Sequence, residues 1–142
     1  MAELVFLKLG GSLITDKTHA YTVRPDKLDE LAGQIAAALD SRPGLTLILG
    51  HGSGSFGHTA AKEYQTRDGL NQSAALTTET RTVDEIRYWH GFAEVWFQAA
   101  QLNRFVMDAL HRAKVPSLAL APVSAVTARD GKVSAWDRRA LR

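Results

Sequence analysis

One glycine-rich stretch of the sequence has the residue types and spacing for phosphate chemistry. Residues 50–58 read GHGSGSFGH and directly follow an apolar run over residues 45–49 that is typical of a buried strand. Residues 59–64 can begin a helix. A strand that ends in glycines and turns into a helix leaves bare backbone N–H groups, which attract an anion, most often a phosphate. The stretch therefore predicts a phosphate cradle with a titratable group, His58, at its rim.

A second glycine turn follows the first expected strand. Residues 4–9 are nearly all apolar, as in a parallel strand covered on both faces, and the sequence Gly-Gly-Ser of residues 10–12 comes next. Lys8 interrupts the apolar run. Because a buried lysine is costly unless it is paired, we expect Lys8 to reach a ligand at the end of this strand; the alternative is an edge-strand lysine whose ammonium group reaches water. Lys17, a few residues beyond the turn, is a second candidate cation.

The elements between the two turns determine how the turns are placed. A helix is predicted from Pro25 to Asp40, with proline in its first turn and apolar residues at helical spacing. The order is then strand, glycine turn, helix, strand, glycine turn, helix. Parallel strands with helical crossovers bring both turns to one edge of the sheet. Two phosphate-binding turns at one edge suggest two phosphates that face each other, which is the geometry of phosphoryl transfer.

The second half of the chain is predicted to be mainly helical. Residues 65–80 are polar and are interpreted as a connection or lid. Residues 83–114 have a helical pattern, with Gly91 as a candidate boundary between two helices. The pattern contains an aromatic cluster, made of Trp89, Phe92, Trp96 and Phe97. We interpret this cluster as core; the alternative is that part of it forms the wall of a pocket for an apolar substrate tail.

The last part of the chain is predicted to be β structure. Residues 115–121 read as a third core strand. Asp130-Gly131 lies between two β-prone runs, residues 126–128 and 133–136. This arrangement predicts a hairpin.

Composition limits the class of protein. The 142 residues suffice for one domain with a hydrophobic core, and 45% hydrophobic and 23% charged residues are typical of a soluble globular domain. The formal net charge of +2 weakly supports an anionic ligand and gives little support for nucleic acid. The absence of cysteine excludes disulfides and cysteine-based catalysis or metal sites. No signal-peptide pattern or membrane-length apolar run is present, so we expect a cytoplasmic protein without a membrane partner.

Three other motifs fit the glycine turns less well. Gly52, Gly54 and Gly57 match the spacing of a dinucleotide-binding turn, but the region where that motif places an acidic residue is a polar stretch without a strand. A dinucleotide-dependent oxidoreductase is therefore a minor alternative. No Gly-Lys-Ser/Thr follows either turn, so the P-loop pattern is absent. No serine of the second turn stands in the Gly-x-Ser-x-Gly pattern of a nucleophile.

Together, the two turns resemble those of a known family. Residues 8–12 with 16–17, and then residues 51–58, are similar to the amino acid kinase family, and within it most to the isopentenyl phosphate kinases. The second turn ends in a histidine, His58, and most other branches of the family lack a histidine at this position. The resemblance is therefore greatest to the isopentenyl phosphate kinases. The similarity extends to shorter matches over residues 91–94, 102–103, 115–116 and 122–124, and so covers nearly the whole chain.

The resemblance implies a fold and an activity. The fold is an α/β, three-layer αβα sandwich with a mainly parallel sheet, in which residues 1–142 form the N-terminal, acceptor-binding part and the C-terminal nucleotide-binding half is absent. The activity is ATP-dependent, in-line phosphorylation of isopentenyl phosphate to isopentenyl diphosphate in isoprenoid biosynthesis, with Mg²⁺ held by the ATP phosphates. A homodimer is implied for the complete protein. The chain alone is expected to be inactive, and unstable or self-associating as a monomer.

The resemblance also implies roles for individual residues. The catalytic residues are Lys8, Lys17 and His58, with Lys17 as the main contact to the transition state and His58 as a hydrogen-bond partner of the acceptor phosphate. The residues implied to bind ATP are Lys8, Gly10, Gly11, Ser12 and Gly54. Those implied to bind the acceptor are Gly52, Ser53, His58 and Val95, with the backbone N–H groups of residues 52–54 holding its phosphate.

Two further functions stay open. One is a related kinase that acts on another small phosphate or phosphonate, such as a fosfomycin kinase. The other is a non-catalytic module that binds an anion or a nucleotide.

Overall fold

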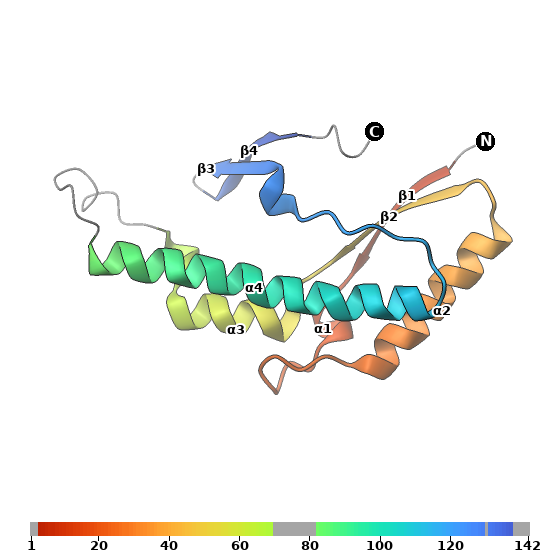
Figure 1. Ribbon diagram of the computed structural model, residues 1–142, viewed down its shortest axis with the longest axis horizontal. Coiled ribbons are helices and arrows are strands. Elements are labelled where there is room, and N and C mark those ends of the chain that lie inside the picture. Colours follow the sequence, from red (N-terminus) through yellow and green to blue (C-terminus); the bar gives the residue numbers. More distant parts are fainter. Residues whose placement is uncertain (1–2, 70–81, 130, 138–142) are drawn as a thin grey trace.

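The chain folds as an α/β structure, as predicted (Figure 1). The computed structural model describes residues 3–69, 82–129 and 131–137. In chain order the elements are β1 (Glu3–Leu9), α1 (Gly11–Ile14), α2 (Pro25–Ser41), β2 (Leu45–His51), α3 (Gly54–Tyr64), η1 (Thr66–Asp68), α4 (Val83–Arg112), η3 (Pro122–Ser124), β3 (Val126–Arg129) and β4 (Lys132–Trp136). Most of the predicted connection over residues 65–80 lies outside the described residues; its first part forms the single 3-10 turn η1.

Strands β1 and β2 form a parallel pair whose ends coincide. Glu3 of β1 lies beside Leu45 of β2, and the register continues without a shift to Leu9 beside His51. The N–H of Gly52 donates to the carbonyl of Leu9 at 2.9 Å, which adds one more bond to the ladder beyond β2. The glycine turns after the two strands therefore begin at the same level of the sheet, as predicted.

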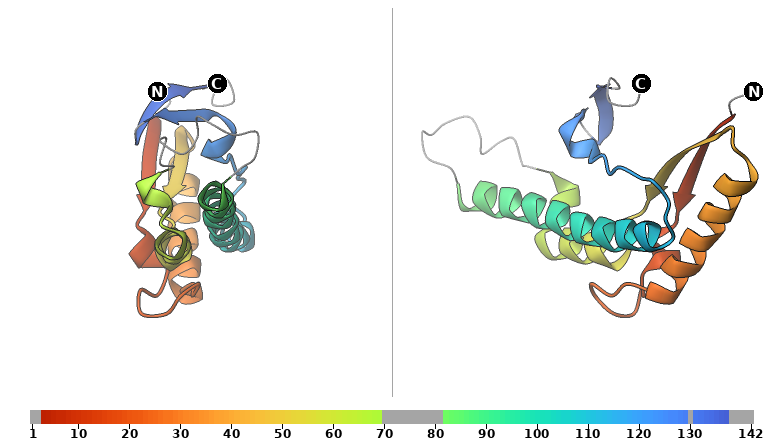
Figure 2. Two further views of the ribbon diagram at one scale, coloured as in Figure 1. Left: turned by 90° about the vertical axis from the view of Figure 1, so that its left-hand side faces the viewer. Right: turned by 45° about the vertical axis from the view of Figure 1, so that its right-hand side comes forward.

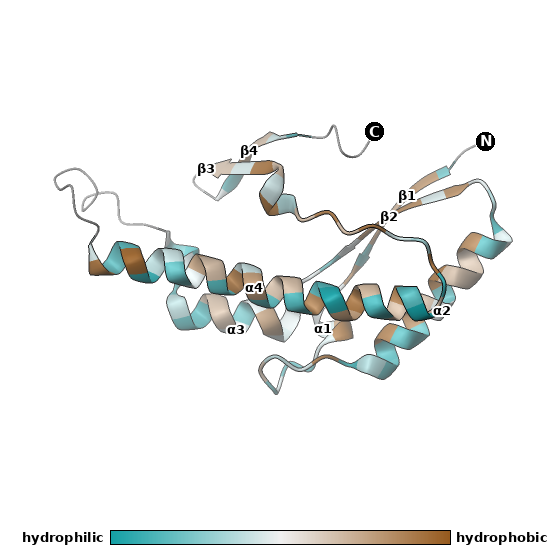
Figure 3. Cartoon of the chain, in the orientation of Figure 1, coloured by the Kyte–Doolittle hydropathy of each residue, from teal (hydrophilic) through white to brown (hydrophobic). Residues whose placement is uncertain are grey.

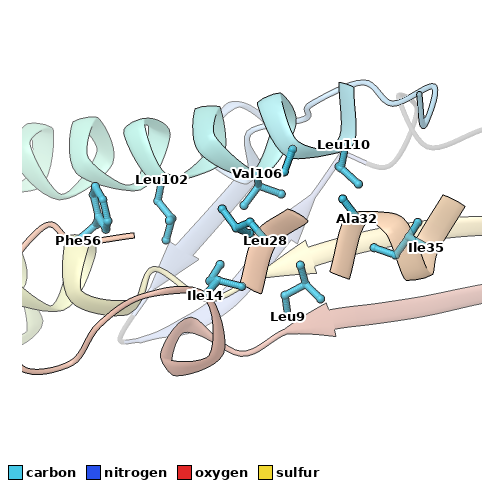
Figure 4. Packing of buried hydrophobic residues seen from close by; sticks show 10 residues of the cluster. Leu9, Ile14, Leu28, Ala32, Ile35, Phe56, Leu102, Val106 and Leu110 are labelled. Carbon is cyan, nitrogen blue, oxygen red and sulfur yellow. The ribbon is translucent and has the colours of Figure 1, made fainter. Parts of the chain in front are cut away.

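The hydrophobic core lies between one face of this strand pair and the helices (Figure 4). Its buried members come from β1 and all four α-helices: Leu9, Ile14, Leu28, Ala32, Ile35, Phe56, Leu102, Val106, Ala109 and Leu110. The last four lie on one face of α4, at the spacing of an amphipathic helix. Because Ile14 and Phe56 belong to this core, the helices that follow the two glycine turns are held in place by burial.

The other face of the strand pair is exposed. Leu47 and Leu49 pack against the core. Side chains alternate between the faces of a strand, and Phe6 is in register with Ile48, so Leu4 and Phe6 lie on the face away from the core. They are 66% and 68% exposed. The prediction that this strand is covered on both faces is therefore wrong for the described part of the chain.

The predicted third strand is absent from the described structure. Residues 115–121 leave α4 as extended chain without a sheet partner, and Leu118 is 94% exposed (Figure 1). The apolar composition of this run suits a strand, but a strand also needs a neighbouring edge for its backbone hydrogen bonds. In the ranges described, the parallel sheet contains β1 and β2 alone. The predicted hairpin does form, with β3 and β4 antiparallel and Gly131 at a φ of +70°.

Helix α4 is one continuous helix of 30 residues, so the predicted boundary at Gly91 is wrong. A Cβ at Gly91 would collide with the side chain of Tyr64 on α3. The two helices lie side by side (Figure 2), and the glycine lets them approach closely. The glycine therefore marks a contact between helices and not the end of one.

The aromatic cluster of α4 is not core. Its four members are each 43–49% exposed: Trp89, Phe92, Trp96 and Phe97. The apolar stripe of α4 is wider than the surface that α2 and α3 cover, which explains why the helical pattern alone suggested burial. Polar residues interrupt the apolar ones along α4 (Figure 3), and none of the helices in the described ranges has both the length and the apolar character to cross a membrane.

Candidate active site

The two glycine turns touch each other at the carboxyl edge of the strand pair. A Cβ at Gly11 would lie only 2.5 Å from the backbone nitrogen of Gly54. A Cβ at Gly52 would lie 2.8 Å from the backbone nitrogen of Gly11. Real Cβ atoms do not approach backbone atoms so closely, so these positions accept only glycine without a shift of the chain. The prediction that both turns meet at one edge is confirmed.

A buried threonine joins the first turns of α1 and α3. Thr15 is 1% exposed, and its hydroxyl donates to the carbonyl of Gly11 at 2.7 Å. The same oxygen accepts the backbone N–H of Ser55 at 3.0 Å. No sequence motif pointed to this residue. The available signal was its spacing, because a threonine hydroxyl can bond the carbonyl four residues earlier.

The turns line an open cleft of about 990 Å³. Eight of the residues predicted to form the site contribute to its wall: Lys8, Gly10, Gly11, Ser12, Lys17, Gly52, Gly54 and His58. Two are not among the lining residues. Ser53 turns its side chain toward Gly57, where an added Cβ would lie 2.5 Å from the Ser53 Cβ, and Val95 is half-buried in α4. The binding roles of Ser53 and Val95 stay predictions.

The first turn presents backbone N–H groups for an anion. The first donor within α1 is the N–H of Leu13, which bonds the carbonyl of Gly10 at 2.9 Å. The N–H groups of Gly11 and Ser12 precede it and therefore have no acceptor within the helix. Both residues line the cleft. These two groups can thus bind phosphate oxygens.

The second turn has fewer such groups than the sequence analysis predicted. The N–H of Gly52 donates to the carbonyl of Leu9, and the N–H of Ser55 donates to the hydroxyl of Thr15. Gly54 stands at the first helical position, with a φ of +51°, and its N–H has no acceptor within α3. The predicted use of the Gly52 N–H for an acceptor phosphate is therefore wrong, although Gly52 still forms part of the cleft wall.

The ionisable side chains of the cleft are mostly basic. Lys8 comes from β1, Lys17 from the loop after α1, and His58 and Lys62 from successive turns of α3. Lys62 was not among the predicted site residues, although its spacing of four residues from His58 places both on one helix face. Glu63 is an acid in the same wall. Ammonium, imidazole and hydroxyl groups suit an anion, and within the described ranges no three acids, histidines or cysteines gather as a metal site.

The loop after α1 forms a hydrogen-bonded turn beside the cleft. The Asp16 carboxylate accepts the Thr18 hydroxyl at 2.6 Å and the Thr18 N–H at 2.8 Å. The Nδ1 of His19 lies 3.0 Å from the other carboxylate oxygen. These bonds, first that of the Thr18 hydroxyl, hold the pKa of the Asp16 carboxyl well below its usual range. Thr18 and His19 line the cleft, and the sequence analysis missed both.

Tyr21 attaches the end of this loop to α3. Its ring packs edge-on against Phe56, with the ring centroids 6.1 Å apart. Burial raises the pKa of the Tyr21 hydroxyl, and the nearby carboxylates of Glu63 and Glu94 add to the effect. Because Phe56 belongs to the core, this contact holds the loop beside the cleft.

Comparison with known proteins identifies the family. The amino acid kinase family matches residues 3–142, which is nearly the whole chain. The chain belongs to the amino acid kinase family. In this chain the match includes the parallel strand pair and the two glycine turns in contact that surround the candidate site.

Two curated relatives within the amino acid kinase family are isopentenyl phosphate kinases. The protein from Methanocaldococcus jannaschii is 33% identical over 131 residues, which cover 89% of this chain and 46% of the relative. The protein from Methanothermobacter thermautotrophicus is 31% identical over 141 residues, which cover 98% of this chain and 48% of the relative. The chain therefore spans about half the length of the curated relatives that it matches.

Solved structures give the same result. A structure of isopentenyl phosphate kinase matches 99% of this chain and 52% of its own, with a TM-score of 0.80 and 32% identity. The T. acidophilum isopentenyl phosphate kinase in a product complex matches 98% of this chain and 49% of its own, with a TM-score of 0.68 and 26% identity. These likenesses confirm the α/β, amino acid kinase-like fold that the resemblance implied.

Proposed function

We propose that this chain is the N-terminal, acceptor-binding part of an ATP-dependent isopentenyl phosphate kinase, with residues 1–142 contributing to a single amino acid kinase domain. The observation that supports the proposal is the close approach of the Gly11 and Gly54 backbones, which brings the two glycine turns together in one cleft. A donor phosphate and an acceptor phosphate held by these turns would be neighbours in that cleft. The isopentenyl phosphate kinases among the relatives supply the identity of the acceptor.

The proposed reaction needs positioning and charge neutralisation more than proton transfer. A phosphate oxygen of the acceptor attacks the γ-phosphorus of ATP, a new P–O bond forms, and the bond to the ADP oxygen breaks. The acceptor is already an anion, so no strong base is required. Holding both reactants in line accounts for much of the acceleration. The products are isopentenyl diphosphate and ADP.

The cleft residues divide between the two reactants. Gly10, Gly11 and Ser12 face the ATP phosphates together with Gly54, and the N–H groups of the α1 turn supply hydrogen bonds. His58 donates a hydrogen bond to the acceptor phosphate. The ammonium groups of Lys8 and Lys17 neutralise charge on the transferring group, with Lys17 as the main transition-state contact.

Further parts of the proposal follow the resemblance to the family. Gly52, Ser53 and Val95 contribute to the acceptor side. Mg²⁺ enters with ATP, is coordinated by the ATP phosphates and adds to charge neutralisation. The complete protein acts as a cytoplasmic homodimer.

The direct test is a transfer assay on the full-length protein. ATP, Mg²⁺ and isopentenyl phosphate are mixed, and ³¹P NMR follows the appearance of the diphosphate signals. We expect isopentenyl diphosphate to accumulate in proportion to ADP, with little ADP in a control that lacks the acceptor. Fosfomycin and other small phosphates are tested in parallel. Transfer to one of these alone would contradict the isoprenoid acceptor, and binding of both ligands without transfer would favour a non-catalytic module.

A further inference from the structure

The loop after α1 brings a second imidazole into the cleft. His19 lines the cleft together with His58 and Lys62 of α3, although no motif pointed to it. The loop is fastened to the first turn of α3, because the N–H of Tyr21 donates to the Ser55 carbonyl at 3.5 Å and the Thr22 N–H donates to the Ser55 hydroxyl at 3.3 Å. The His19 side chain itself is 73% exposed. It is therefore both attached to the site and accessible to a ligand.

The orientation of the His19 ring is set by its neighbours. Nδ1 lies 3.0 Å from the Asp16 carboxylate and 2.9 Å from the Thr18 hydroxyl. A carboxylate can only accept, and the Thr18 hydroxyl already donates to Asp16, so Nδ1 is the nitrogen that carries a proton. A carboxylate that holds one ring nitrogen fixes the tautomer and leaves the other nitrogen for a ligand. For His19 the remaining nitrogen is Nε2.

We propose that His19 is a second histidine ligand of the acceptor phosphate, which it binds through Nε2 when the ring is protonated. The positively charged ring donates Nε2–H to a phosphate oxygen, a charge-assisted bond. The neutral ring, with its proton on Nδ1, presents a lone pair at Nε2 and cannot donate to the same oxygen. His19 thereby makes phosphate binding depend on pH. The identity of the ligand as isopentenyl phosphate rests on the proposed function; the phosphate contact does not.

The other charged groups around the cleft determine how this effect is measured. They are Lys8 of β1, Asp16 and Lys17 of the loop, and His58, Lys62 and Glu63 of α3. The lysine charges change little near neutral pH, whereas imidazole charges change in that range. The phosphate itself also titrates there, and His58 is another imidazole in the same cleft. The effects of His58 and of the phosphate are the same in the wild type and in a His19 variant. They therefore cancel in the ratio of the two phosphate affinities at one pH.

The first test measures the affinity of the full-length protein for inorganic phosphate by calorimetry at about pH 6 and about pH 8. We expect His19→Gln to weaken binding by about tenfold or more at the lower pH, because glutamine is a neutral donor and cannot replace the charge-assisted bond of the protonated ring, and to have little effect at the higher pH. His19→Lys retains a positive charge at both values and should restore most of the affinity. His111→Gln, an exposed histidine at the end of α4, is the matched control.

The second test observes the ring directly. ¹H–¹³C NMR of the histidine rings, assigned with the same variants, follows the protonation curve of His19 with and without inorganic phosphate. Phosphate should move the midpoint of that curve to higher pH, because an anion favours the protonated ring. The proposal is overturned if saturating phosphate leaves the curve in place, or if His19→Gln binds phosphate as the wild type does at about pH 6.

The two proposals can fail separately. The full-length protein could phosphorylate isopentenyl phosphate while inorganic phosphate shifts the protonation curve of His58 and not that of His19. That result would overturn the inference about His19 alone. A phosphate response of His19 without any transfer to isopentenyl phosphate would overturn the proposed acceptor and support the phosphate contact.

Discussion

The buried hydroxyl of Thr15 lies 3.0 Å from the backbone nitrogen of Ser55 and accepts its hydrogen bond. Because the same hydroxyl donates to Gly11, one side chain connects the two helix starts that follow the glycine turns. Elsewhere these turns meet through glycine backbones that have no side chain to hold them. Thr15 therefore helps to fix the relative position of the two turns, in addition to the burial of Ile14 and Phe56.

Removal of this hydroxyl should disturb both stability and binding. Thr15→Val keeps the branched shape but leaves the Ser55 N–H without its partner in a buried site, which typically costs about 1–3 kcal/mol. We expect a corresponding decrease in the free energy of unfolding, measured with denaturant, and weaker phosphate binding in the folded protein. Thr15→Ser is the control: it keeps the hydroxyl, so it should bind phosphate as the wild type does. Equal binding by Thr15→Val would show that the hydroxyl does not position the turns.

Two adjacent glycines should respond differently to alanine. A Cβ at Gly11 meets the backbone of Gly54, whereas a Cβ at Gly10 has no atom within 4 Å. Gly11→Ala forces the turns apart and should lower the free energy of unfolding by about 1–3 kcal/mol, a typical effect of overpacking. Gly10→Ala should unfold within about 0.5 kcal/mol of the wild type, as most unstrained surface changes do. Similar unfolding curves for the two variants would contradict the contact between the turns.

At Gly91, helix propensity and packing are expected to change the stability of an alanine variant in opposite directions. Alanine favours a helix interior over glycine by about 1 kcal/mol, so Gly91→Ala would stabilise α4 if nothing faced this position. Because the new methyl group would collide with Tyr64, we expect a net loss of stability in thermal unfolding. Gly33→Ala in α2, where a Cβ has no atom within 4 Å, is the matched control and should raise stability. A gain for Gly91→Ala would exclude the close helix contact.

Lys17 and His58 are expected to be essential for transfer. Lys17→Ala and His58→Ala each remove a group proposed to contact a reacting phosphate, and loss of one such contact commonly lowers the rate by about 10²–10³-fold. Turnover of isopentenyl phosphate by the full-length variants measures the effect. Lys132→Ala in β4 and His111→Ala in α4 change the same residue types outside the cleft and should retain wild-type rates. Near-normal turnover of either cleft variant would remove that residue from the mechanism.

The hydrogen bonds of Asp16 should affect how strongly the thermal midpoint decreases at acidic pH. The pKa of this carboxyl is lowered in the folded protein, so its contribution is present above the pKa of an unfolded aspartate, about 3.9, and is lost as the pH falls below that value. Asp16→Asn should flatten the decrease of the thermal midpoint between about pH 4 and about pH 2. Thr18→Ala removes the donor with the largest effect and should flatten it in part. If the thermal midpoints of the wild type, Asp16→Asn and Thr18→Ala decrease equally over this pH range, this role of Asp16 is contradicted.

The position of the site could be predicted because it follows from local order. A strand, a glycine turn and a helix occur twice, and the parallel pairing of β1 and β2 then brings the turns together. Lys8 near the end of the first strand and Lys17 just beyond the first turn could be included on sequence position alone. The second imidazole could not, because His19 joins the cleft only through the attachment of its loop to α3.

The errors arose where a pattern has more than one structural meaning. A glycine inside a helical pattern can end a helix or allow a close contact, and Gly91 does the latter. An apolar run can be a strand only where an edge is free to pair, which the composition of residues 115–121 does not reveal. The aromatic side chains of α4 fit a buried stripe equally well, but which part of a stripe is covered depends on the helices packed against it.

Thr15 and Ser55 are 40 positions apart along the chain. Their bond connects the turns that follow β1 and β2, and such distant pairings form slowly because a long loop must first be closed. A nascent or partly unfolded chain thus contains both glycine sequences but no anion site. Ligand binding should report the final step of folding, later than the appearance of helix.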